Sequence, residues 1–96
     1  MRKITLSWSD KKAAENLRKH GVSFEEAASV FSDENARLIH DPDHSSEEDR
    51  YILLGFSSKL RLLIVHHTYR GDEQEIRNIS ARNATRREGR QYGSFL

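Results

Sequence analysis

The sequence of 96 residues contains no cysteine and a single proline. Without cysteine the chain can hold neither a disulfide framework nor a zinc site built from thiolates, and this composition fits a cytoplasmic protein. The longest uninterrupted aliphatic run is Leu62–Val65, which is far short of the roughly 20 residues that span a membrane. The N-terminal segment is charged and has no apolar core, so we expect neither a signal peptide nor membrane association.

Apolar residues are also scarce. They make up 35% of the chain, and charged residues nearly equal them at 32%. A chain of this length supports one hydrophobic core, and a thin one. We therefore expect a single domain over residues 1–96, with a short tail at 94–96.

Charge is distributed unevenly, although the formal net charge is only +1. Residues 1–24 carry a net +4, residues 25–50 carry −7, and residues 77–96 carry +4. This polarity predicts a cationic face for a polyanion or an acidic partner, with the acidic middle of the chain elsewhere.

Hydrophobic periodicity and turn residues predict the element order β-α-α-β-β-β-β-α. The predicted strands cover residues 3–8, 36–40, 50–56, 60–69 and 76–82. The predicted helices cover residues 10–20, 24–31 and 85–93. Successive hairpin-linked strands imply an α+β fold with a mostly antiparallel sheet and the first two helices on one face. The strand at 60–69 is the most apolar and should be central in the sheet.

Each predicted helix has a start signal. Ser9 is a suitable N-cap, and Ser23 and Thr85 each open a capping box with a glutamate three residues later. Gly21 is expected to end the first helix. The apolar stripe of that helix is weak and consists of Ala13, Ala14 and Leu17.

The last predicted strand and the helix after it carry the most distinctive pattern. Strict alternation places Ile79 and Ala81 on one face of the strand and Asn78, Ser80 and Arg82 on the other. The strand then feeds an arginine-rich helix, which makes a cationic edge on a rigid platform. Guanidinium groups match phosphate oxygens bidentately, so this edge is a candidate phosphate site. The alternative is a solvated helix with a few ion pairs.

The histidines are candidate metal ligands, but their spacing in the sequence argues against a metal site. His40 and His44 are four residues apart, but Pro42 between them forbids a regular helix that would place both rings on one face. His66 and His67 are adjacent in a strand, so their side chains point to opposite faces. One of them should be a core or edge histidine, and the other should face the open side of the sheet.

The remaining candidate chemistry is a cationic cluster of Arg70, Arg77 and Arg82, with His67 nearby if the hairpin pairs as predicted. Such arginines can hold an RNA phosphate and stabilise the charge that develops on it during cleavage. His67 or Glu88 can move a proton. Because the chain has no nucleotide or metal motif, attack by the 2′-hydroxyl is the simplest cleavage these groups support. Binding without catalysis remains the alternative.

Taken together, several segments closely resemble the BrnT family of type II toxin–antitoxin toxins. These segments are Lys19–Ala27, Val30–Asp33, His67–Gly71 and Ile79–Glu88. The resemblance extends from Ile4 to Tyr92. It implies a compact RelE-like fold and an endoribonuclease that cleaves RNA and inhibits translation without a metal or other cofactor. It also implies a cognate BrnA-type antitoxin with a ribbon-helix-helix domain.

The resemblance also assigns roles to individual positions. The implied catalytic residues are Arg70, Arg82, His67 and Glu88. Lys19 and His20 match a family motif and are candidate RNA-binding residues, with the alternative that His20 only closes the first helix, where a cation favours the helix dipole. Arg77, Arg86 and Arg87 of the cationic edge are the other candidates for RNA binding. The chain departs from the family at Gly89, where a basic residue is usual. Because glycine costs a helix interior roughly 1 kcal/mol, we expect a short last helix.

Two functional hypotheses follow. The first is a ribonuclease toxin that an antitoxin neutralises by direct binding, in a complex with more than one toxin copy because ribbon-helix-helix domains dimerise. The second is a non-catalytic module whose basic edge docks an acidic protein partner. Growth arrest on expression in bacteria would separate the two.

Overall fold

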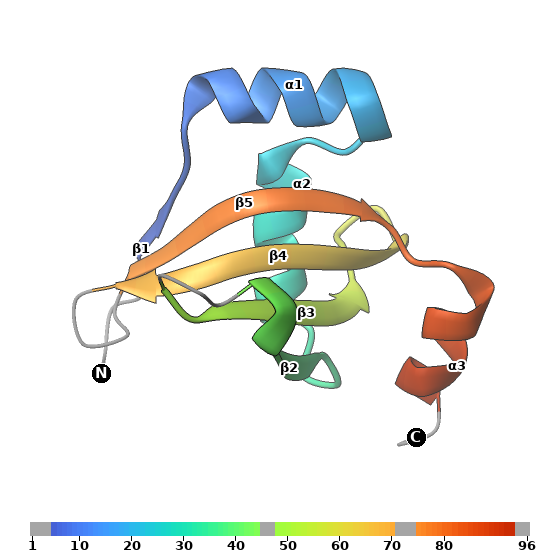
Figure 1. Ribbon diagram of the computed structural model, residues 1–96. Coiled ribbons are helices and arrows are strands. Elements are labelled where there is room, and N and C mark those ends of the chain that lie inside the picture. Colours follow the sequence, from blue (N-terminus) through green and yellow to red (C-terminus); the bar gives the residue numbers. More distant parts are fainter. Residues whose placement is uncertain (1–4, 45–47, 71–74, 94–96) are drawn as a thin grey trace.

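The computed structural model describes residues 5–44, 48–70 and 75–93 (Figure 1). Within these residues the helices are α1 (Asp10–His20), α2 (Phe24–Ser29) and α3 (Arg86–Gly93). The strands are β1 (Thr5–Ser7), β2 (Arg37–Asp41), β3 (Arg50–Phe56), β4 (Leu62–Arg70) and β5 (Glu75–Asn83). The predicted α+β order is confirmed. The expected tail at 94–96 and the expected turn at 71–74 lie outside the described residues. None of the described helices is long and apolar enough to cross a membrane.

The five strands form one sheet in the order β1-β5-β4-β3-β2. β1 pairs with β5 in parallel, and the other three pairings are antiparallel. β4 is central, as predicted, because side chains on both of its faces must be buried. Leu63 and Val65 are buried on one face and Ile64 on the other.

Helix α2 lies on one face of the sheet, and α1 runs along the outer edge of β5 (Figure 1). Side chains from α2 and its flanks pack there on β3, β4 and β5. The buried cluster contains Val22, Ala27, Val30, Leu53, Leu63, Val65 and Ala81. Gly21 ends α1 with a φ of 69°, in the left-handed region that glycine adopts without strain.

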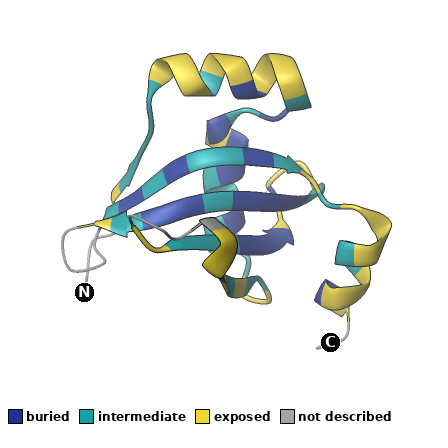
Figure 2. Cartoon of the chain, in the orientation of Figure 1, coloured by how far each residue is buried: buried dark blue, intermediate teal, exposed yellow. Residues whose placement is uncertain are grey.

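Polar contacts, rather than an apolar stripe, attach α1 to the sheet. Leu17 of the expected stripe is 52% exposed, and Asn16 is the buried residue of α1. Figure 2 shows the rest of this helix largely exposed. The Asn16 amide donates to the carbonyls of Ala81 (2.8 Å) and Val22 (2.9 Å) and accepts from the Ala81 N–H (3.0 Å). One side chain thus occupies the edge of β5 in the way a neighbouring strand would.

Helix α3 anchors on the opposite side of the sheet. The buried Tyr92 packs with Leu54 and Ile64, and its hydroxyl donates to Asp33 Oδ2 at 2.8 Å. The predicted capping box is present, because the Glu88 N–H bonds Thr85 Oγ1 (3.2 Å) and the Thr85 N–H bonds Glu88 Oε1 (2.8 Å). These contacts fix α3 beyond the end of β5.

The predicted alternation in β5 is wrong because the strand contains a β-bulge. His66 pairs with Ser80 but His67 pairs with Asn78, so Ile79 is an extra residue on the β5 side. The bulge places Asn78 on the same face as Ala81, and Asn78 is 1% exposed. The predicted pairing of Ile79 with Ala81 on one face is therefore not formed.

Candidate functional site

The strand register orders the side chains on the open face, which is the face opposite α2. One row runs through successive partners on four strands: Asp41, Arg50, Thr68 and Arg77. The next row contains Ile39, Ile52, His66 and Ser80. Paired residues project from the same side of a sheet. Two arginines and a histidine therefore lie on one face of the sheet around a buried threonine. We call these four residues the open-face site: Arg50, His66, Thr68 and Arg77.

The two ends of the open face differ in character. Tyr92 of α3 covers the apolar end over Leu54 and Ile64. Beyond this cover, a hollow of about 270 Å³ is lined by Arg50, His66, Ile79 and Ser80. Three of these four lining residues are polar or charged, and the hollow lies where Tyr92 of α3 does not cover the sheet.

Thr68 stands between the two arginines of its row. It is 1% exposed, and within the described residues its Oγ1 has no hydrogen-bond partner. A buried hydroxyl normally finds a partner, since leaving it unbonded costs free energy. Because Oγ1 has less than 1 Å² of exposed surface, the hydroxyl does not reach a ligand, and Thr68 instead separates Arg50 and Arg77, its partners on the two neighbouring strands.

The adjacent histidines of β4 lie in different environments. The side chain of His66 is 24% exposed on the open face, and its Nδ1 lies 4.0 Å from Asp41 Oδ2. It also lines the hollow beside Arg50. An imidazole within reach of both solvent and a phosphate site can transfer protons.

His67 lies in the core on the helix-covered face and is fully buried. Its ring contacts Phe31 at a centroid distance of 4.9 Å, and its Nδ1 and Nε2 lie 3.1 Å from the Val65 carbonyl and 3.2 Å from the Tyr69 hydroxyl. Burial lowers the pKa of His67 to about 4, an effect that the Val65 carbonyl partly opposes and His66 reinforces. His67 is therefore neutral at pH 7 and does not join the arginines with which it was grouped.

The predicted cluster of Arg70, Arg77 and Arg82 is only partly formed. Arg77 pairs with Thr68 and Arg70 pairs with Glu75, so these two arginines lie near one another. Arg82 pairs with Ile64, six residues from Arg70 along β4. At about 3.3 Å per residue this places them roughly 20 Å apart. The error came from grouping residues that lie at opposite ends of one hairpin.

Arg82 and Glu88 form an ion pair with two parallel hydrogen bonds of 2.8 and 2.9 Å. The Arg82 hydrogen bonds are the main cause that lowers the pKa of Glu88, to about 2, and the pair raises the pKa of Arg82. Glu88 also caps α3 through Thr85. The two residues thus link β5 to α3, and their charges largely neutralise each other.

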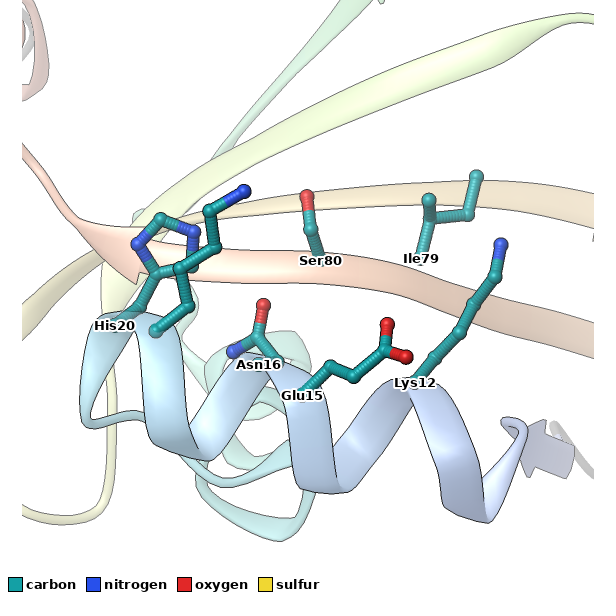
Figure 3. A pocket seen from close by; sticks show the side chains of 7 residues that line it. Lys12, Glu15, Asn16, His20, Ile79 and Ser80 are labelled. Carbon is teal, nitrogen blue, oxygen red and sulfur yellow. The ribbon is translucent and has the colours of Figure 1, made fainter.

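The residues expected to bind RNA are spread over three elements. Arg77 lies in the open-face site, Arg86 and Arg87 are exposed on α3, and Lys19 and His20 lie at the end of α1. Lys19 and His20 line a second hollow with Lys12 (Figure 3). Within the described residues, no group of three or more His, Asp or Glu side chains is arranged to hold a metal ion.

The predicted site residues did not include Arg50, His66, Thr68 or Lys12. Of the two adjacent histidines, the prediction named His67 as a candidate catalytic residue, whereas the structure places His66 on the open face. One signal was available for Arg50. It lies two residues before Ile52, so strand alternation puts both side chains on one face. The pairing between strands, which brings Arg50 beside Thr68 and Arg77, depends on register and was not visible in the sequence.

Comparison with known proteins places these features in a family. No curated protein matches the chain. The crystal structure of the ribonuclease toxin BrnT from Brucella abortus matches with a TM-score of 0.63 and 23% sequence identity, covering 90% of this chain and 100% of that one. This likeness shows a shared fold. Residues 8–88 match the family model described as "Ribonuclease toxin, BrnT, of type II toxin-antitoxin system". Because this match covers most of the sequence, the chain belongs to the BrnT family of ribonuclease toxins.

Proposed function

We propose that the chain is an endoribonuclease that cleaves RNA at the open-face site and thereby inhibits translation. The observation that carries this proposal is the row in which Thr68 lies between Arg50 and Arg77, with His66 in the neighbouring row. The family membership supports RNA as the substrate. The arrangement adds a location where phosphate and a proton-transfer group would meet.

The proposed reaction is a transesterification within the RNA. The 2′-oxygen attacks the adjacent phosphorus, the bond from phosphorus to the 5′-oxygen breaks, and a 2′,3′-cyclic phosphate forms. His66 accepts the proton of the 2′-hydroxyl, and the departing 5′-oxygen takes a proton from water. Arg50 and Arg77 stabilise the negative charge that grows on the phosphate oxygens. No step requires a metal ion.

The other arginines take supporting roles in this proposal. Arg70 is half exposed, with its guanidinium 3.9 Å from Glu48 Oε2, and it extends the basic surface beyond Arg77. Arg82 and Glu88 hold α3 in place through their paired hydrogen bonds. The exposed Arg86 and Arg87 on α3 would contact RNA phosphates farther along the strand.

The test compares the wild-type chain with an Arg50→Ala/Arg77→Ala double variant on single-stranded RNA in EDTA. We expect cleavage products with 2′,3′-cyclic phosphate ends from the wild type, and a loss of about 10³-fold in kcat/KM in the variant, since each lost contact is worth a few kcal/mol. Lys59→Ala, an exposed cation outside the site, is the matched control. A folded wild-type chain that neither cleaves RNA nor arrests growth would instead favour the docking module.

We further propose that a BrnA-type antitoxin neutralises the chain by binding across the basic surface near Arg70, Arg77, Arg82 and Arg86. An acidic segment of the antitoxin would pair chiefly with Arg77 and Arg86, since Glu88 already pairs with Arg82, and such pairing makes association sensitive to salt. Because ribbon-helix-helix domains dimerise, the complex should contain more than one toxin copy. Light scattering of the co-purified complex, repeated after charge reversal at Arg77 and Arg86, tests both points. A single toxin copy per complex contradicts the second.

A further inference from the structure

A second hollow, of about 190 Å³, lies between α1 and the outer edge of β5 (Figure 3). It is lined by Lys12, Glu15, Asn16, Lys19 and His20 from α1 and by Ile79 and Ser80 from β5. In Figure 3 the Lys12 side chain reaches toward β5 on the side of Ile79, and His20 lies at the other end. The hollow therefore presents basic groups at both ends of a passage along the strand edge.

The hollow exists because β5 is covered in two separate places. β1 pairs with β5 only as far as Arg77. The Asn16 amide then bonds the backbone of Ala81. Between these two points the strand bulges at Ile79. Bulges occur frequently beside binding and active sites, where they redirect side chains.

The same two residues of β5 also line the hollow of the open-face site. Ile79 and Ser80 belong to the wall of both hollows, with Arg50 and His66 on one side and Lys12 and Lys19 on the other. The two hollows thus adjoin across the bulge. A ligand that leaves the open-face site in this direction passes over Ile79 and Ser80 into the hollow beside α1.

The charge of the second hollow suits a phosphate chain. Lys12 and Lys19 are opposed by the single carboxylate of Glu15, so these three side chains carry a net positive charge. Lys12 and Lys19 are seven residues apart, which is two helical turns or about 10 Å along α1. This spacing places them at separate points along a bound strand. Ile79 offers an apolar surface against which a base can pack.

We propose that single-stranded RNA bound at the open-face site continues over Ile79 and Ser80 into the hollow beside α1, where Lys12 and Lys19 bind its backbone phosphates. This inference rests on the proposed function, because it extends the path of the same substrate. It predicts that RNA long enough to span both hollows binds more tightly than RNA that fills only the first.

The experiment measures fluorescence anisotropy with 2′-O-methyl RNA of 12 and 4 nucleotides, which the 2′-hydroxyl reaction leaves intact. For Lys12→Ala/Lys19→Ala we expect about a tenfold loss of affinity for the 12-mer and a loss within twofold for the 4-mer. The slope of log affinity against log salt should fall by about 1.4 for the 12-mer, since each phosphate contact on a single strand contributes about 0.7. Lys11→Ala/Lys59→Ala removes the same charge from exposed positions outside both hollows and is the matched control.

Three outcomes overturn the inference. An equal loss for both RNA lengths, or an equal loss in the control variant, shows that the lysines act only through net charge. Loss of antitoxin binding with unchanged RNA binding assigns the hollow to a protein partner instead. These results differ from failure of the proposed function, in which the wild-type chain binds and cleaves no RNA of either length.

Discussion

The two adjacent histidines of β4 lie on opposite faces of the sheet, and their environments differ in exposure and polarity. On the helix-covered face, His67 is fully buried among aromatic rings, and burial lowers its pKa to about 4. On the open face, His66 is partly exposed beside Arg50 and within 4.0 Å of Asp41. One peptide bond separates the two, and strand alternation alone sends them to different environments.

The type of a residue is therefore a weak guide to its role in a strand, because the face of the sheet on which it lies decides its environment. A histidine in a dry, aromatic site remains neutral and contributes packing. A histidine on a wet, arginine-lined face keeps the ability to exchange protons with a ligand. The core therefore needs His67 for its shape, and the proposed reaction needs His66 for its chemistry.

Exchanging either histidine for alanine tests this comparison most directly. We expect His66→Ala to lower kcat/KM for RNA by about 100-fold, the usual scale for loss of a proton-transfer group, with a change in unfolding free energy below about 0.5 kcal/mol. We expect His67→Ala to lower the unfolding free energy by about 3 kcal/mol, because it leaves a cavity in the core. Urea unfolding and cleavage rates on both variants supply the measurements.

The two variants serve as controls for each other. If His67→Ala lost activity while keeping its full stability, the buried ring would have a functional role that its position does not explain. If His66→Ala unfolded the protein, its loss of activity would say nothing about proton transfer. His66→Gln, which retains a polar side chain on the strand, would then provide the folded comparison.

The pKa of His67 also predicts how stability depends on pH. Its pKa is about 4 when folded and 6.5 in the unfolded reference. The neutral form is favoured in the folded state, so the stabilisation is fully present above pH 6.5 and is lost as pH falls toward 4. Between pH 7 and pH 5 we expect a loss of about 2 kcal/mol.

Urea unfolding of the wild type and of His67→Phe at these two pH values measures the effect. The phenylalanine cannot be protonated, so the loss between pH 7 and pH 5 should shrink to the part that other groups contribute. The same loss in both proteins would mean that another group titrates. Below pH 4.5 a second decline should begin, because the lowered pKa of Glu88 marks a carboxylate that is stabilised in the folded state.

Much of the fold followed from local sequence signals. The capping serines and threonine marked helix starts correctly, and the apolar run of residues 60–69 identified the central strand. Such signals depend on neighbours in the chain, which a single sequence displays. Attachment of α1 through Asn16 was not predictable in this way, because its partners Val22 and Ala81 include a residue 65 positions away.

The candidate site was less accessible to prediction for the same reason. Resemblance and composition pointed to arginines, and Arg77 does lie on the open face. The bulge at Ile79 changes the face of the sheet on which the following residues of β5 lie, and no residue near Ile79 in the sequence indicates a bulge. The grouping of Arg50, Thr68 and Arg77 arises from the register of three strands. Register is set by turns and by packing over the whole sheet.

Thr68 gives the smallest of these tests and the one most specific to the open face. Its hydroxyl is buried between Arg50 and Arg77 without a partner in the described residues.

Thr68→Val keeps the branched shape that strands favour and removes the unbonded hydroxyl. We expect the unfolding free energy to rise by about 1 kcal/mol, because an unbonded buried hydroxyl costs roughly that much or more. We expect affinity for RNA to change by less than twofold, since the buried hydroxyl has no surface with which to contact a phosphate. Thr5→Val, at an exposed position of β1, is the matched control and should change neither quantity. A drop in stability for Thr68→Val would show that the hydroxyl is bonded in the free protein, and its place on the open face would then be structural.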